Sequence, residues 1–146
     1  MTRRSLRSPT SEYVTCIDTS VMVSLLSPDD SNHQEAKSWF INLLRLKSLL
    51  AASVVVEVEL KRSLQRRSAP LELGRAANEL LEMFERVDLT PEIRKVAAEL
   101  TPPSTRSLDA IHVATALAAE ADAFLTFDLR QRVAAEEANL ATSLWD

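Results

Sequence analysis

The sequence predicts an α/β domain in which a parallel sheet is covered by helices on both faces. Along its 146 residues, short apolar runs alternate with longer segments whose apolar residues recur at helical spacing. Such alternation brings the strands into one parallel sheet and places the connecting helices on its faces. A chain of this length suits a single core that buries roughly 68–70% of the unfolded surface. We expect one domain over residues 13–146 and a short flexible tail over residues 1–12.

The apolar runs are the expected strands, because each is short and lacks helical periodicity. They span residues 13–17, 49–52, 86–89, 123–126 and, as a closing strand, 140–144.

The segments between these runs are the expected helices. Ala36 and Phe40 recur with later leucines at helical spacing, and Pro91 suits the first position of another helix. Two consecutive prolines make residues 101–105 a loop, after which Ser107 is expected to cap the next helix. The expected helices are a short one after residues 18–20, then 33–46, 71–84, 91–100, one starting at 107, and 129–138.

The chain has only one glycine, Gly74. Positive backbone φ angles favour glycine, and Asn and Asp tolerate them next best. We therefore expect turns of this kind to use mostly Asn or Asp, with Asn139, just after the last helix, as the main example.

Composition limits the classes of function. There are 17 Lys and Arg against 21 Asp and Glu, for a net charge of −4, which excludes a globally basic nucleic-acid binder but not a local basic surface. The one cysteine, Cys16, cannot form an intramolecular disulfide and has no partner at zinc-ligand spacing, so we expect a cytoplasmic protein. No apolar run reaches the length of a membrane span.

Four acidic residues lie beside apolar, core-like sequence. Asp18 and Asp128 each follow an expected strand, and Asp109 lies in the first turn of an alanine-rich helix, where the helix dipole tolerates its charge. Glu59 follows a valine-rich run. Because a buried carboxylate is costly unless it is paired or binds a metal, we expect these four side chains to share a cation site. Oxygen ligands alone favour Mg²⁺ or Mn²⁺ over zinc.

The choice between Glu57 and Glu59 depends on the conformation of residues 54–64. A strand would place both acids on one face, whereas a helix would separate them by about 200°. The outward spacing of Lys61 and Arg62 favours a helix in which Glu59 points inward and Glu57 is an ordinary solvated residue.

The motifs around these acids resemble a known family. The segments are Asp18-Thr19-Ser20, Glu59-Leu60 followed by Arg62, Leu108-Asp109-Ala110-Ile111-His112-Val113-Ala114-Thr115-Ala116, and Leu125-Thr126-Phe127-Asp128. Together they resemble PIN-domain nucleases, and more closely the bacterial VapC-type toxins, over residues 13–144. One departure is Asn139, where many relatives have glycine, a change that the backbone tolerates.

The resemblance implies a three-layer α/β/α sandwich whose carboxylates hold Mg²⁺, or Mn²⁺, and hydrolyse the phosphodiester backbone of RNA. It also implies a homodimer and a small antitoxin that binds an apolar groove and blocks the site. A divalent cation would offset the repulsion between the acids and a phosphodiester and would activate a bound water. On the matching positions, the catalytic and metal-binding acids are Asp18, Glu59, Asp109 and Asp128, and their polar supports are Ser20 and Thr126. We expect Asp18 and Asp109 to be the main ligands, and Glu59 and Asp128 to bind through water or to orient the nucleophile.

Basic residues follow two of the acids and are either RNA contacts or solvated helix faces. They are Lys61, Arg62, Arg66 and Arg67 after Glu59, and Arg130 and Arg132 after Asp128, with Arg62, Arg66 and Arg130 the preferred RNA contacts. His112, three residues after Asp109, is interpreted mainly as a helix-packing residue, with an acid or base facing the pocket as the alternative. Trp39 and Phe40 are interpreted mainly as core or as part of a partner groove, with base-stacking platforms as the alternative.

Two classes of function remain. The first is a metal-dependent endoribonuclease that acts as the toxin of a toxin–antitoxin pair, or a housekeeping RNA-processing nuclease. The second is a catalytically silent module that binds RNA or protein. An aspartate-based phosphatase would need a second Asp two residues after Asp18, where Ser20 stands.

Overall fold

A four-stranded parallel sheet lies at the centre of the protein. The computed structural model describes residues 13–144, so the tail expected at residues 1–12 lies outside the described residues. The strands are β1 (Val14–Ile17), β2 (Leu49–Ser53), β3 (Glu85–Val87) and β4 (Ala123–Leu125), in the spatial order β3-β2-β1-β4. In β1, Thr15 is in register with Leu50 of β2 and Ala123 of β4. The three strand pairs, β1–β2, β1–β4 and β2–β3, are all parallel. The carboxyl ends of the strands therefore meet at one edge of the sheet.

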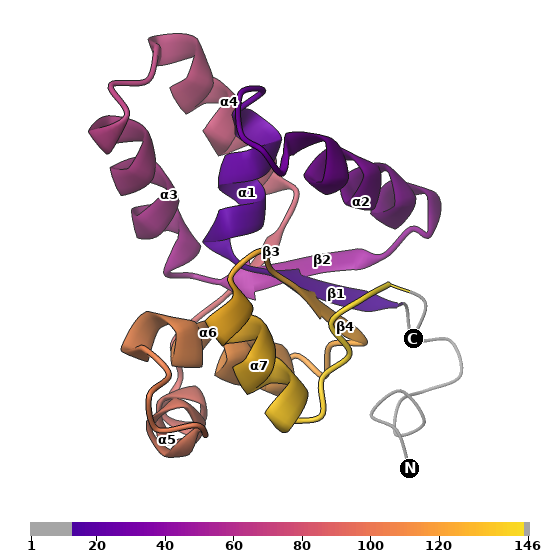
Figure 1. The fold of residues 1–146 in the computed structure, drawn as a ribbon, viewed down its shortest axis with the longest axis vertical. Helices are drawn as coiled ribbons and strands as arrows, with labels where there is room; N and C mark the ends of the chain where they lie inside the picture. The colour runs from indigo at the N-terminus through magenta and orange to yellow at the C-terminus, as the bar shows by residue number, and fades with distance from the viewer. Residues whose placement is uncertain (1–12, 145–146) are drawn as a thin grey trace.

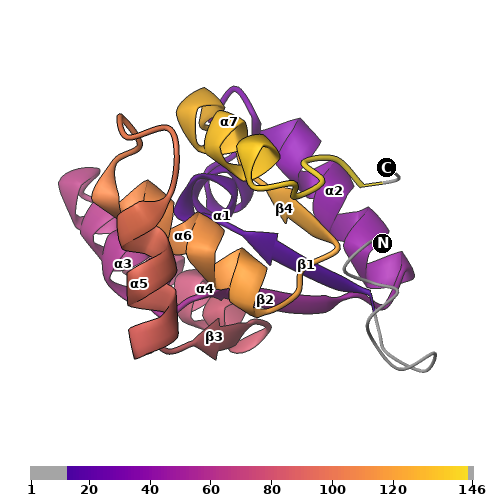
Figure 2. The ribbon, with the colours of Figure 1, turned by 90° about the horizontal axis from the view of Figure 1, so that it is seen from below.

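Helices cover both faces of this sheet, which confirms the predicted three-layer α/β/α fold (Figure 1). One face carries α1 (Thr19–Leu26), α2 (His33–Arg45), α3 (Val56–Arg66) and α4 (Leu71–Glu82). The other carries α5 (Pro91–Glu99), α6 (Ser107–Ala118) and α7 (Leu129–Glu137), which Figure 2 shows from below. No helix in the described part of the chain is long and apolar enough to cross a membrane.

Each face of the sheet has its own core. Ile17 packs with Met22, Leu60 and other large residues of α1 to α4. Val14 and Cys16 face the opposite way and pack with residues such as Val113, Ala116, Ala134 and Ala135. The alternation along β1 follows from the two-residue repeat of a strand. Small alanine side chains let α6 approach the sheet closely, and α7 packs beside α6.

Two local expectations were wrong. Residues 140–144 form no strand, although the Phe124 amide donates to the Ala141 carbonyl at 2.8 Å. Leu140 and Leu144 instead anchor in the two cores, so their apolar character serves packing. Ser107 does not cap α6, because it is the first helical residue and Arg106, the N-cap, makes no side-chain capping bond.

In the described residues, positive φ angles occur at the residue that follows the C-cap of a helix. Asn139 has a φ of 67°, as expected, but Lys47, Ser68 and Glu120 have φ angles of 54°, 49° and 53°. The expectation that Asn or Asp would fill most of these positions was therefore wrong. The helix C-terminus imposes the left-handed conformation, whatever residue lies there. Gly74 lies within α4 and has no positive φ.

Candidate active site

Asp18 lies at the carboxyl end of β1, where it is 3% exposed. Its Oδ1 accepts hydrogen bonds from Ser20 Oγ at 2.6 Å and from the Val21 amide at 3.3 Å, and its Oδ2 accepts one from Thr126 Oγ1 at 2.7 Å. Burial raises the pKa of this carboxyl, and the hydrogen bonds and nearby His112 only partly offset it. The fold therefore holds an acid where its charge is unfavourable.

Ser20 and Thr126 join the loops that follow β1 and β4. Besides contacting Asp18, Ser20 Oγ accepts the Phe127 amide at 3.1 Å, and Thr126 Oγ1 accepts the Asp128 amide at 3.0 Å. The two hydroxyls thus fix the backbone that leads to Asp128. That these two residues support a metal ligand stays a prediction.

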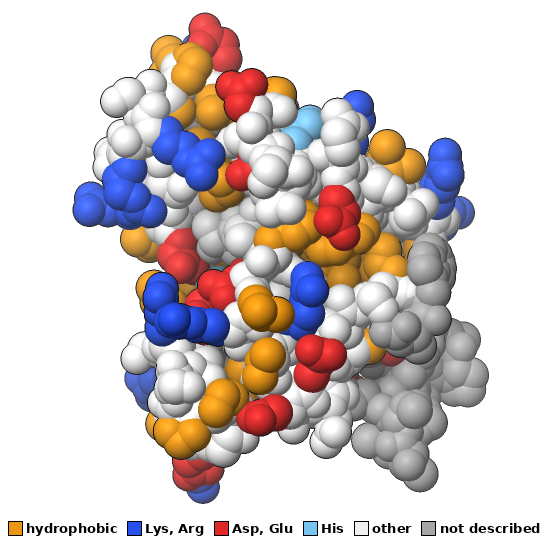
Figure 3. Space-filling view, viewed as in Figure 1, with side chains coloured by type: hydrophobic (Ala, Val, Ile, Leu, Met, Phe, Trp, Pro, Cys, Tyr) orange, Lys and Arg blue, Asp and Glu red, His pale blue; other side chains and the backbone are white. Residues whose placement is uncertain are grey.

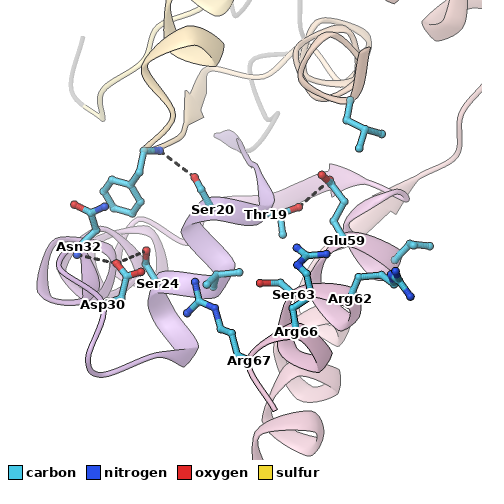
Figure 4. A pocket seen from close by; sticks show the side chains of 14 residues that line it. Thr19, Ser20, Ser24, Asp30, Asn32, Glu59, Arg62, Ser63, Arg66 and Arg67 are labelled. Carbon is cyan, nitrogen blue, oxygen red and sulfur yellow. Dashed lines mark hydrogen bonds between the residues drawn. The ribbon is translucent and has the colours of Figure 1, made fainter. Parts of the chain in front are cut away.

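Glu59 reaches the same edge from α3, whose helical conformation confirms the expected choice of secondary structure. Its Oε1 accepts a hydrogen bond from Thr19 Oγ1 at 2.9 Å and lies 2.6 Å from His112 Nε2 (Figure 4 shows the Thr19 bond). Burial raises the pKa of Glu59, but the hydrogen bond and charge of His112, together with Thr19, outweigh it and leave the pKa lowered. Glu57 lies outside this group. Its Oε1 forms an ion pair with Arg86 Nη1 at 3.1 Å, so it is not simply a solvated residue.

Asp109 lies in the first turn of α6 and keeps one oxygen free. Its Oδ1 accepts a hydrogen bond from Gln131 Nε2 at 2.8 Å, whereas its Oδ2 is buried and has no hydrogen-bond partner among the described residues. Burial raises the pKa of Asp109, and the charge of Asp128 raises it further. A buried carboxylate oxygen without a donor, beside a second acid, is suited to a cation.

Asp128 caps the first turn of α7. Its Oδ1 accepts the amides of Arg130 at 2.9 Å and Gln131 at 3.3 Å. Asp18, Glu59, Asp109 and Asp128 therefore come from four different segments to one region of the sheet edge, linked through Thr126, His112 and Gln131.

No group of three or more His, Cys, Asp or Glu side chains within residues 13–144 has the arrangement of a metal-binding cluster. Mg²⁺, however, keeps several waters and is commonly held by one or two carboxylates together with substrate phosphates. The free Asp109 oxygen and the all-oxygen donor set fit an ion of this type.

The predicted basic contacts are divided among different surfaces. Arg62, Arg66 and Arg67 line a cleft of about 500 Å³ that also contains Glu59. Arg130 lines a separate depression beside residues 102–105. Figure 3 shows basic and acidic side chains close together along the edge where α3 faces α6.

The two other predicted basic residues have different positions. Lys61 lines an apolar groove between α3 and α4, away from Glu59. Arg132 donates from Nη2 to the Thr126 carbonyl at 2.9 Å, so it supports the loop after β4.

Comparison with known proteins adds a match to the family model described as "PIN domain", over residues 15–137. The chain belongs to the PIN-domain family. Among curated PIN-domain relatives, the chain is 33% identical to "Ribonuclease VapC35" of Mycobacterium tuberculosis over 129 residues, covering 86% of this chain and 92% of that protein. It is 31% identical to "Ribonuclease VapC47" of the same species, covering 87% of this chain and 93% of the relative.

Solved structures show the same fold. The VapBC2 structure from Rickettsia felis, bound to a DNA fragment from its promoter, contains a chain with a TM-score of 0.70 at 18% identity, covering 91% of this chain and 99% of the other. VapC20 of Mycobacterium tuberculosis, described as a sarcin-ricin loop cleaving toxin, has a TM-score of 0.66 at 20% identity, covering 82% and 94%.

Two side chains of this PIN domain lie in the site although sequence reasoning did not assign them to it. His112 is 3% exposed and is a packing residue of α6, as interpreted, but it also contacts Glu59. The sequence feature that pointed to His112 is its spacing of three residues from Asp109, which places both side chains on one face of the helix. Gln131 is 2% exposed and joins Asp109 to Asp128. Its spacing of three residues from the helix cap was the available signal.

Proposed function

We propose that this PIN domain is a Mg²⁺-dependent endoribonuclease, with Mn²⁺ as an alternative ion, that hydrolyses RNA phosphodiester bonds. The observation that carries the proposal is the set of four carboxylates at one sheet edge, in which Asp109 keeps a buried oxygen without a donor. Relatives at 33% and 31% identity, which match nearly the whole domain, are named ribonucleases.

Asp18 and Asp109 are the residues that would hold the ion directly, with Glu59 and Asp128 binding through water or orienting the attacking water. When bound, such an ion lowers the pKa of a coordinated water and stabilises charge on the phosphoryl oxygens. The raised pKa values of Asp18 and Asp109 support the assignment, because a nearby cation favours the ionised forms that burial disfavours.

The other side chains position these acids. Ser20 and Thr126 hold both oxygens of Asp18, Gln131 fixes one oxygen of Asp109, and Thr19 and His112 hold Glu59. Glu59, with its lowered pKa, is ionised at neutral pH. Prepositioned groups of this kind reduce the reorganisation needed during the reaction.

Incubation of purified protein with a labelled RNA tests the activity. We expect cleavage with Mg²⁺ or Mn²⁺, none in EDTA, and recovery when Mg²⁺ is restored. The variant Asp18→Asn, which keeps the shape of the side chain, is expected to remain folded and inactive. Undiminished cleavage in EDTA would show that the proposed metal dependence is wrong.

We further propose that the protein acts in the cytoplasm as the toxin of a toxin–antitoxin pair, as a homodimer or a complex with its antitoxin. VapBC2 from Rickettsia felis and a toxin–antitoxin complex from Klebsiella pneumoniae share the fold. Expression should arrest growth, and co-expression of the adjacent small open reading frame should relieve the arrest. Growth arrest by Asp18→Asn at the level of the unaltered protein would argue against toxicity through RNA cleavage.

A further inference from the structure

The cleft beside Glu59 continues away from the acids. It extends from Thr19, Ser20 and Glu59 to Asp30 and Asn32 in the connection between α1 and α2 (Figure 4). Three arginines of α3 and the residue after it, Arg62, Arg66 and Arg67, form one side of it. The acids are therefore one end of a longer hollow, and the other end has its own chemistry.

The arginine side lacks the partners that would neutralise it. All three arginines are exposed, and Arg67 Nη1 donates to Ser27 Oγ at 3.3 Å. Within residues 13–144, neither Arg62 nor Arg66 has an ion pair with a carboxylate. Three guanidinium groups in one cleft, in a chain with net negative charge, favour an anionic ligand such as a phosphate.

Asn32 presents a free amide on a fixed backbone. Its amide N–H donates to Asp30 Oδ1 at 2.8 Å, and Ser24 Oγ donates to the same oxygen at 3.0 Å. Asn32 is the N-cap of α2, yet its side chain makes no capping hydrogen bond. The side-chain amide therefore has its donors and its acceptor available, the combination that recognises a base edge.

An aromatic ring borders the same cleft. Phe127 lines it, and its ring stacks on that of Trp39 with 4.6 Å between centroids and 8° between planes. The stack packs the Phe127 ring against Trp39, and the Phe127 amide donates a hydrogen bond to Ser20 Oγ. Trp39, interpreted from sequence as core, thus supports a cleft wall.

We propose that this cleft is a subsite for one unpaired nucleotide next to the scissile phosphate, with Arg66 and its neighbours on a phosphate and Asn32 on the base edge. Phe127 would provide the apolar surface against the base. The proposal rests on the proposed function, because it concerns the RNA that the acids would cut. An acidic peptide would satisfy the arginines but would leave the amide and the ring without a matching group.

The base preference of cleavage tests the role of Asn32. A pool of short single-stranded RNAs with random sequence is cut by the unaltered protein, Asn32→Ala and the control Asn42→Ala, and the products are sequenced. We expect Asn32→Ala to reduce the preference at one position beside the cut by roughly tenfold, because one amide–base pair carries this much discrimination. Asn42→Ala should keep the original profile. An unchanged profile for Asn32→Ala would overturn the assignment of base recognition.

RNA binding without cleavage tests the role of the arginines. In the Asp18→Asn background, Arg66→Gln is compared with the control Arg45→Gln by fluorescence anisotropy with a single-stranded RNA hexamer. We expect weaker binding for Arg66→Gln only, with a smaller salt dependence by about 0.7 in the logarithmic slope, the value for one contact to a single strand. Equal RNA binding by the two variants would overturn the proposal. So would a result in which Arg66→Gln weakens the binding of an acidic peptide such as oligoglutamate but not the binding of RNA.

These two experiments separate the subsite from the activity. If the unaltered protein cuts no RNA, the proposed function fails, while the binding comparison in the Asp18→Asn background still decides whether the cleft holds RNA. If it cuts RNA but both variants match their controls, only the subsite fails.

Discussion

Nε2 of His112 lies 2.6 Å from Oε1 of Glu59, joining α6 to α3 across the candidate active site. His112 is almost fully buried, whereas about a quarter of the Glu59 side chain is exposed. The same oxygen of Glu59 also accepts the Thr19 hydroxyl. The position of this acid is therefore set by residues from two other helices.

The contact should contribute measurably to stability. A double-mutant cycle with His112→Leu and Glu59→Gln, followed by urea unfolding, should give a coupling free energy of about 1–3 kcal/mol, because the pair is largely buried. The matched cycle with Arg86→Gln and Glu57→Gln should give about 0–1 kcal/mol, as for a partly exposed surface pair. Equal coupling in the two cycles would mean that the His112 contact is no stronger than a surface pair.

Asp18→Asn should stabilise the protein at neutral pH while abolishing cleavage. The pKa of Asp18 is raised in the folded protein above its ordinary value of 3.8, mainly by burial. The favourable contribution of protonated Asp18 to the free energy of unfolding is therefore fully present below pH 3.8. It is lost as the pH rises through the pKa of the folded protein. We expect the variant to melt roughly 2–5 °C higher at pH 7 and the difference to shrink towards pH 4, measured in metal-free buffer. A lower melting temperature than the unaltered protein at pH 7 would contradict this account.

Gln131→Leu should weaken metal binding by leaving Asp109 without its positioning donor. We expect the Mg²⁺ concentration for half-maximal cleavage to rise by about tenfold, as for other residues that orient metal ligands. Direct Mn²⁺ titration by calorimetry should show the same shift. Gln34→Leu, on the exposed side of α2, is the control. Identical Mg²⁺ dependence in the two variants would remove Gln131 from the site.

Divalent ions should stabilise the folded protein without RNA. Mg²⁺ at about 100 times its dissociation constant should add about 2.7 kcal/mol to the free energy of unfolding. The rise in melting temperature should disappear in Asp109→Asn and persist in Glu57→Gln, whose side chain pairs with Arg86 outside the site. A thermal shift that survives in Asp109→Asn would place the ion elsewhere.

Much of the fold was predictable because it follows from local patterns. The alternation of apolar runs and helical segments predicted the parallel sheet and its helices, and inward spacing identified Glu59 over Glu57. The prediction of a closing strand was wrong. Leu140 and Leu144 are apolar, as residues of a buried strand would be, but they pack into the cores on opposite faces of the sheet. Local apolarity does not distinguish these two uses.

The four acids of the candidate site could be proposed from the sequence, whereas some of the residues that contact them could not. Each acid follows a recognisable motif, whereas the roles of His112 and Gln131 depend on which helices lie next to one another. Arg62 and Arg130 looked equivalent in sequence, since each follows an acid closely. The structure places them in separate depressions because α3 and α7 pack on opposite faces of the sheet.

The most direct test of the central claim is the cleavage rate of one labelled RNA at saturating Mg²⁺ across five variants. Four replace the acids of the site, as Asp18→Asn, Glu59→Gln, Asp109→Asn and Asp128→Asn, and Glu57→Gln is the control. We predict that each of the four loses at least about 100-fold in rate, in line with the loss of groups that stabilise a transition state, and that the control keeps its activity. Full activity in Asp18→Asn or Asp109→Asn would contradict the account.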